Sequence, residues 1–156
     1  MKRISLVFLQ AVVVLIGIGV LTFMLWEPHF EGRNVDATFF QVYFNDLFLA
    51  YAYAASIPFF VAVYNAFKAL GCVGQGKAFS RVTVKAMRTI RRCALLLVGL
   101  VALPEAYLMI VRPGDDIAGG VAMGLMVIFV SLVVAAGADV LVGVLRSGVD
   151  VKSESD

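Results

Sequence analysis

Four long apolar runs, separated by short polar segments, dominate the pattern of hydrophobic and polar positions along the chain. They cover approximately residues 5–26, 47–68, 93–111 and 117–145. A helix of about 20 apolar residues rises roughly 30 Å, which is the thickness of the hydrocarbon core of a bilayer. The pattern therefore predicts an all-α integral membrane protein, a four-helix bundle that forms one transmembrane domain over residues 1–156.

The first and fourth runs need separate comment, because their lengths differ from what a simple span requires. The first follows Lys2 and Arg3, as in a signal peptide, but it exceeds the usual apolar segment of about 7–15 residues and no small-residue cleavage site closes it. We expect it to be retained as a helix. The fourth run has 29 residues, so we expect it to tilt or to project into the cytosol. Its Gly120 and Gly124 match the small-xxx-small pattern of closely packed membrane helices.

The composition agrees with a chain whose solvent is lipid. Hydrophobic residues make up 62% of the sequence and charged residues only 15%, with a mean hydropathy of +0.95. A soluble domain of this composition would lack the polar surface that it needs in water. The two cysteines, Cys72 and Cys93, and the single histidine, His29, have no metal-ligand spacing. We expect two reduced thiols, no metal site and no cofactor.

The charged residues lie unevenly on the two sides of the predicted membrane. Of the thirteen Lys and Arg residues, all but Arg33 and Arg112 fall on the side of the chain termini. Cytoplasmic loops of membrane proteins carry an excess of Lys and Arg. The bias predicts that both the N-terminus and the C-terminus are cytosolic.

Residues 79–92, between the second and third runs, contain five cations and no acid. At about 100° per residue, four of them (Arg81, Lys85, Arg88 and Arg92) fall within a stripe roughly 60° wide. Thr83, Ala86, Met87 and Ile90 form the opposite face, and Ser80 is placed to cap the N-terminus. The pattern predicts an amphipathic basic cytosolic helix between the second and third spans. It either lies on the inner membrane surface or forms a stem continuous with the third span.

Three functions are open to the basic face, which consists of the stripe and the neighbouring Arg91. Lipid contact is favoured, because cations near a bilayer bind the anionic headgroups of the inner leaflet. Docking of a cytosolic protein is the next interpretation. Direct nucleic-acid binding is disfavoured, because the stretch offers no recognised reading module and no stacking residues apart from Phe79.

Aromatic side chains are concentrated in the segment that follows the first run. Phe39, Phe40, Tyr43 and Phe44 recur at helical spacing, which is typical of an anchor at the membrane–water interface. We expect these four residues to lie on the outer membrane surface or on the bundle, and a ligand site is the less favoured interpretation.

Two carboxylates, Glu105 and Asp139, lie inside predicted spans, where an ionisable group needs a partner or a function. Counted along their helices, Glu105 lies near the outer boundary and Asp139 near the inner one, so they cannot form a catalytic pair. We expect Tyr53 to reach the level of Glu105. We expect Gln10 and Asn65 to reach the level of Asp139, with Arg92 and the neighbouring cations close enough to pair with it.

The sequence contains no catalytic triad, no zinc motif and no phosphate-binding loop, and we predict that the protein is not an enzyme. The favoured function is a membrane regulator or sensor whose basic helix contacts lipid or a cytosolic partner. The alternative is a small transporter or channel that works as a homo-oligomer, with Glu105 as its intramembrane coupling acid.

Five segments of the chain resemble one known family. They are LWEPHFEGRN (25–34), YFNDLFLAYAYAASIPFFVAVYNAFKAL (43–70), GKAFSRVTVKAMRTIRRCA (76–94), GDDIAGGVAMGL (114–125) and the terminal VDVKSESD. In this order they resemble the bacterial membrane proteins of unknown function called DUF 2975, and the likeness covers nearly the whole chain. The resemblance implies a four-helix protein of the bacterial inner (cytoplasmic) membrane with no assigned activity.

The resemblance has two further implications. Members of the family are often encoded beside a small helix-turn-helix regulator, which implies a cytosolic regulator of that kind as a partner. Tails similar to this one often continue for a few residues past the final acid, so we expect the tail ending at Asp156 to be shortened.

Overall fold

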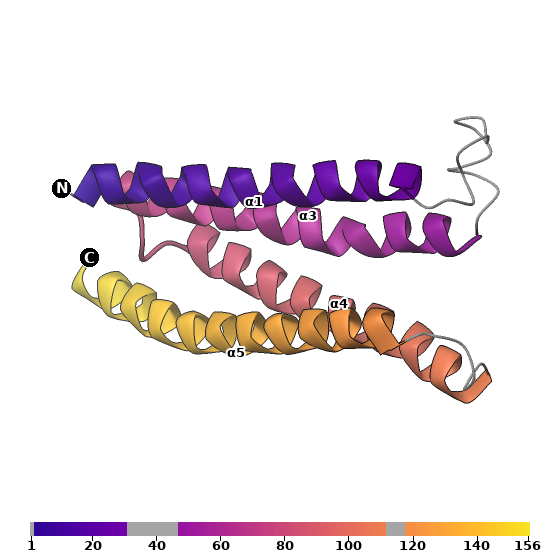
Figure 1. The fold of residues 1–156 in the computed structure, drawn as a ribbon. Coiled ribbons are helices and arrows are strands. Elements are labelled where there is room, and N and C mark those ends of the chain that lie inside the picture. The colour runs from indigo at the N-terminus through magenta and orange to yellow at the C-terminus, as the bar shows by residue number, and fades with distance from the viewer. Residues whose placement is uncertain (1, 31–46, 112–117) are drawn as a thin grey trace.

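The computed structural model of the chain describes residues 2–30, 47–111 and 118–156, which form four helices (Figure 1). They are α1 (Lys2–Phe30), α3 (Leu47–Gly74), α4 (Arg81–Val111) and α5 (Ala118–Ser155). The described ranges contain no strand, and each helix is long and apolar enough to cross a membrane. The predicted all-helical fold with four spans is confirmed.

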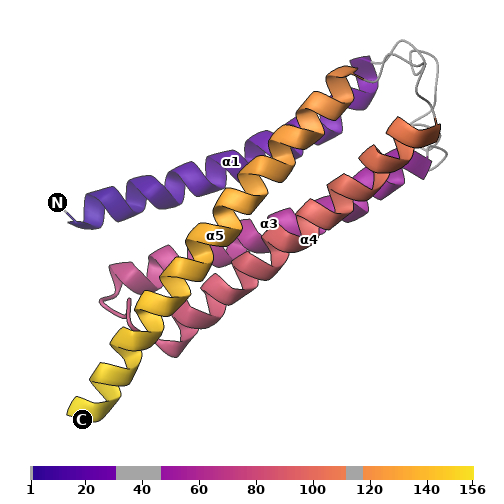
Figure 2. The same ribbon diagram turned by 90° about the horizontal axis from the view of Figure 1, so that it is seen from below.

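The helices form a row in which neighbours in sequence pack together. α1 packs against α3, α3 against α4, and α4 against α5, while no other pair of described helices makes extensive contact. Figures 1 and 2 show α1 and α5 on opposite sides of this row, with both chain ends at the same end of the molecule. The arrangement is more open than a bundle in which the first and last helices also meet, because lipid can cover the faces that a soluble bundle must bury.

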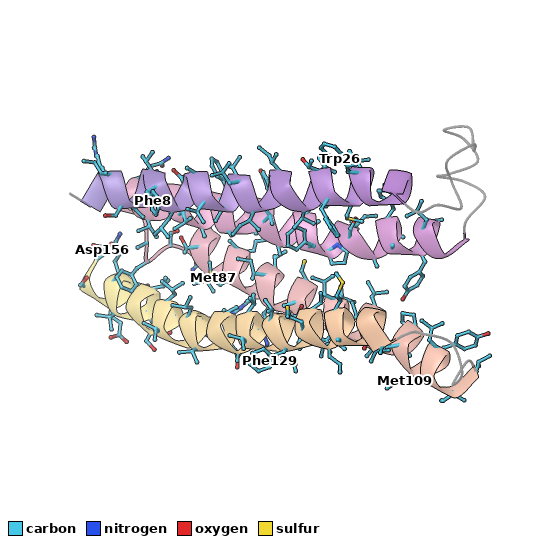
Figure 3. All side chains as sticks on the ribbon, viewed as in Figure 1. Phe8, Trp26, Met87, Met109, Phe129 and Asp156 are labelled. Atoms are coloured by element: carbon cyan, nitrogen blue, oxygen red, sulfur yellow. The ribbon has the colours of Figure 1, made fainter. Side chains whose placement is uncertain are left out.

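Small side chains form the helix contacts. The buried residues among those described are Gly17 of α1, Ala69 of α3, Thr83, Val84, Ala86, Ile90, Cys93 and Ala94 of α4, and Ser131, Ala135 and Ala138 of α5. Large apolar side chains such as Trp26 and Phe129 lie on the outer sides of the helices (Figure 3). The accessible surface of 11212 Å² far exceeds the roughly 7,700 Å² of a compact soluble chain of this mass. The exposed apolar area is the surface that a bilayer would cover.

All four helices are longer than the apolar runs that predict them, and α4 and α5 exceed their runs most. α4 begins at Arg81, so the basic stretch is not a separate helix between two spans but the first part of the helix that contains the third run. A break after Arg92 would leave backbone groups unpaired at two new helix ends, and no glycine or proline favours one there. α5 continues to Ser155, ten residues beyond the predicted end of the fourth run.

Candidate functional site

The basic part of α4 is held in place by hydrogen bonds at its N-terminus. The backbone N–H of Thr83 donates to Ser80 Oγ at 3.3 Å, and the backbone N–H of Val84 donates to the Ser80 carbonyl at 3.1 Å. The Thr83 hydroxyl donates to the Lys77 carbonyl at 3.2 Å. The bond to Ser80 Oγ satisfies an N–H group that has no backbone partner inside the helix, and the bond from Val84 is the first backbone bond of the helix. They confirm Ser80 as the cap and fix the direction in which α4 starts.

A tight turn connects α3 to this cap. The N–H of Gln75 donates to the Gly71 carbonyl at 3.2 Å and that of Lys77 to the Cys72 carbonyl at 2.9 Å. Gly76 adopts φ 74°, a left-handed conformation that favours glycine. The ring of Phe79 then lies against Gly148 of α5, in the space that a β-carbon would need. The turn thus connects α3 to α4 and also contacts the C-terminal part of α5.

The first four turns of α4 separate into two faces. Thr83, Val84, Ala86 and Ile90 are buried in the contacts with the neighbouring helices. The five cations of the basic face are exposed, namely the stripe of Arg81, Lys85, Arg88 and Arg92, and Arg91 beside it. Because its apolar face is already occupied by protein, this segment cannot also lay that face on a membrane surface. The stripe itself remains available for contact.

One cation of the basic face has an acidic partner in the described part of the chain. Arg91 Nη1 lies 2.8 Å from Oδ1 of Asp139 on α5. The sequence predicts Arg92 or a neighbouring cation for this role, and the partner is Arg91, which lies about 100° from Arg92 around α4, on the side that faces α5. Within the described ranges, no other ion pair involves the four cations of the stripe.

The other polar residues predicted within the spans bond to helix backbones rather than to the two carboxylates. Gln10 Nε2 donates to the Phe67 carbonyl at 3.4 Å, and the Tyr53 hydroxyl donates to the Met24 carbonyl at 2.9 Å, so both connect α1 to α3. Asn65 Nδ2 donates to the Val61 carbonyl of its own helix at 2.8 Å. These bonds join the residues to helix backbones, and the membrane levels expected for Tyr53, Gln10 and Asn65 stay a prediction.

Sequence reasoning missed one polar contact between spans. The hydroxyl of Tyr51 donates to the Leu100 carbonyl at 2.8 Å and so connects α3 to α4. A phenol in an apolar run is a signal for such a bond, because its O–H needs an acceptor when water is excluded. Tyr51 stands two residues before Tyr53, and both phenols bond to backbone carbonyls of a neighbouring helix.

Glu105 lies in the contact between α4 and α5. Its side chain is half-buried, and its Oε1 atom is buried without a hydrogen-bond partner among the described residues. The carboxyl group occupies the space that a β-carbon on Gly124 would fill, and Val101 Cγ1 lies 3.2 Å from that same position. A β-carbon on Gly120 would meet nothing within 4 Å, so only one glycine of the predicted pair is packed.

Neither a metal cluster nor the predicted aromatic anchor adds a candidate site among the described residues. In the part of the chain that the structure describes, no group of three or more His, Cys, Asp or Glu side chains could hold a metal ion. The aromatic anchor of Phe39, Phe40, Tyr43 and Phe44 lies outside the described residues. The basic face of α4 and the carboxyl of Glu105 are consequently the two candidate sites.

Comparison with known proteins places the chain among membrane proteins. The chain is 38% identical over 160 residues to the uncharacterised membrane protein YoaS of Bacillus subtilis, an alignment that covers 100% of this chain and 98% of that protein. No solved structure matches the chain. The model of the family described as protein of unknown function (DUF2975) matches residues 11–156. The similarity extends through all four helices and both candidate sites, and the chain belongs to this family.

Proposed function

We propose that this protein is a non-enzymatic regulatory protein of the bacterial inner membrane that docks an acidic cytosolic protein on the basic face of α4. The observation that carries the proposal is the exposure of Arg81, Lys85, Arg88 and Arg92, which have no acidic partner in the described part of the chain, beside a buried opposite face. Cations that the fold does not use are available to bind another molecule.

The position of each cation along the axis of α4 determines whether lipid headgroups can reach it. The helix rises about 28 Å from Arg92 to Val111, which matches the hydrocarbon core and places Arg92 at its boundary. A headgroup layer adds about 5–8 Å on each side of the core. Arg88 lies about 6 Å beyond Arg92 along the axis, within this layer, whereas Lys85 lies about 10 Å and Arg81 about 16 Å beyond it.

The stripe therefore divides into two pairs with different partners. Arg88 and Arg92, the inner pair, bind anionic headgroups of the inner leaflet. Arg81 and Lys85, the outer pair, stand beyond the headgroups and are left for an acidic surface of a cytosolic protein, of which a small helix-turn-helix regulator is the first candidate. The bias of Lys and Arg towards the side of the chain termini supports a cytosolic position for both pairs.

The test is co-purification in mild detergent from the native host. Exposed ion pairs contribute about 0.2–1 kcal/mol each, and reversing a charge adds repulsion, so Arg81→Glu with Lys85→Glu should reduce partner retention about tenfold. The matched control is Arg146→Glu with Lys152→Glu, which makes the same change of charge on exposed positions of α5. It should retain the partner.

Substitution of the inner pair tests the proposed contact with lipid headgroups. Arg88→Glu with Arg92→Glu should lower the amount of co-purified anionic lipid, measured by mass spectrometry, while the outer-pair variant should leave it unchanged. Topology is verified for every variant, because cations near a span also set orientation. Equal retention of a cytosolic protein by the wild type and a correctly oriented outer-pair variant would contradict the docking function.

A further inference from the structure

Glu105 is the one carboxylate of the described chain that is buried against another helix without a bonding partner for its Oε1 atom. Its carboxyl group lies on Gly124 of α5, and the absence of a side chain there creates the space that the carboxyl fills. The fold thus provides room for this group but no described donor for it. An ionised carboxylate in such a place would be unpaired in a medium that stabilises charge poorly.

The elements packed around α4 supply no cation in the described residues. On α5, residues 118–138 contain no ionisable side chain. Residues 47–60 of α3 contain two ionisable side chains, the phenols of Tyr51 and Tyr53, and both donate to backbone carbonyls. On α4 itself, residues 93–111 contain only Cys93 and Tyr107 besides Glu105, so no positive charge in these segments can balance a carboxylate.

The burial of Oε1 also restricts what could reach it from outside. The atom has essentially no accessible surface, so a lipid headgroup, a second copy of the chain or a bulk water can contact it only if α4 and α5 separate. A metal ion would need several oxygen ligands, while the groups at the Gly124 contact are the glycine itself and the side chain of Val101. A proton is the one ligand that the carboxyl can hold without additional room.

We propose that Glu105 is an intramembrane proton-binding site that holds its proton while α4 is packed on α5 at Gly124. The protonated carboxyl is neutral, and a neutral oxygen such as Oε1 without a partner is tolerated far better than an ion. When α4 and α5 separate at this contact, water reaches the carboxyl, accepts the proton as hydronium and leaves a solvated carboxylate. Proton occupancy and the packing of α4 on α5 are therefore coupled.

Infrared spectroscopy of the protein in lipid bilayers at neutral pH tests the site directly. Exposed Asp and Glu side chains are ionised at this pH, so the C=O stretching band of a protonated carboxylic acid is expected from Glu105. The band should be present in the wild type, move on deuteration and disappear in Glu105→Gln. The control variant Asp139→Asn removes an ion-paired carboxylate and should keep the band.

A second pair of variants separates the site from a general folding defect. Gly124→Ala places a methyl group where the carboxyl lies and should shift or abolish the acid band, whereas Gly120→Ala, on the same helix but in open space, should leave it unchanged. A wild-type spectrum with no acid band would overturn the proposal, as would a band that persists in Glu105→Gln. These spectra are independent of the docking function, because they do not involve the basic face of α4.

Discussion

The ion pair between Arg91 and Asp139 is a contact at a helix surface, and its position limits what it can contribute to stability. The two atoms are 2.8 Å apart, but the side chains are 47% and 56% exposed. Exposed ion pairs contribute about 0–1 kcal/mol, because water screens them and two long side chains lose freedom.

We expect Asp139→Asn to lower the free energy of unfolding by less than about 1 kcal/mol. The measurement is a double-mutant cycle with Arg91→Gln in a reversible detergent unfolding assay. A coupling energy of several kcal/mol would show instead that lipid or detergent shields this pair from water.

Single residues also mark the limit of what the sequence can predict about the sites. Helical spacing identified the exposed cations and the buried Thr83, Ala86 and Ile90, because both faces follow from about 100° per residue, whereas the predicted Met87 is only half-buried. The choice between Arg91 and Arg92 as the partner of Asp139 depends on the side of α4 that faces α5. Whether Gly120 or Gly124 packs against α4 depends in the same way on how α5 is rotated about its axis. A rotation of one helix about its axis leaves hydropathy unchanged, so only the packed structure decides it.

At the scale of the elements, hydropathy predicted the spans well and their ends poorly. Residues 5–26 lie within α1 and residues 93–111 within α4, because any apolar helix that crosses a bilayer needs about this length. α4 and α5 extend beyond their apolar runs, since a helix ends where its backbone or caps change rather than where its polarity does. For α4, the capping residue Ser80 marks where the helix begins.

The contact between the turn before α4 and the C-terminal part of α5 leads to a prediction at this scale. The ring of Phe79 occupies the space beside Gly148, whereas a β-carbon on Gly143 would meet nothing within 4 Å. Gly148→Ala should therefore destabilise the protein by about 1–3 kcal/mol through overpacking. Gly143→Ala should be neutral or stabilising by up to about 1 kcal/mol, because alanine favours a helix.

Thermal unfolding in detergent, followed by circular dichroism, compares these two variants on one helix. Adding Phe79→Ala to Gly148→Ala should relieve the clash and recover part of the loss. Equal stabilities of the two glycine variants would mean that Phe79 is not packed on α5 in the membrane protein.

At the scale of the whole molecule, the row of helices brings the two chain ends to the same end (Figure 1). An even number of spans requires this whichever way the protein is inserted. The orientation comes from a different property, the excess of Lys and Arg beside the chain ends. The docking function that we propose depends on this orientation, because the basic face of α4 must meet the cytosol.

Single-cysteine labelling measures the orientation. In a background that carries Cys72→Ser and Cys93→Ala, a membrane-impermeant maleimide is applied to intact spheroplasts of cells that express Ser153→Cys or Asp115→Cys. With both termini in the cytosol, Asp115→Cys should be labelled in intact spheroplasts and Ser153→Cys only after the membrane is permeabilised. Labelling of Ser153→Cys before permeabilisation would place the basic face of α4 outside the cell, and no cytosolic protein could then bind it.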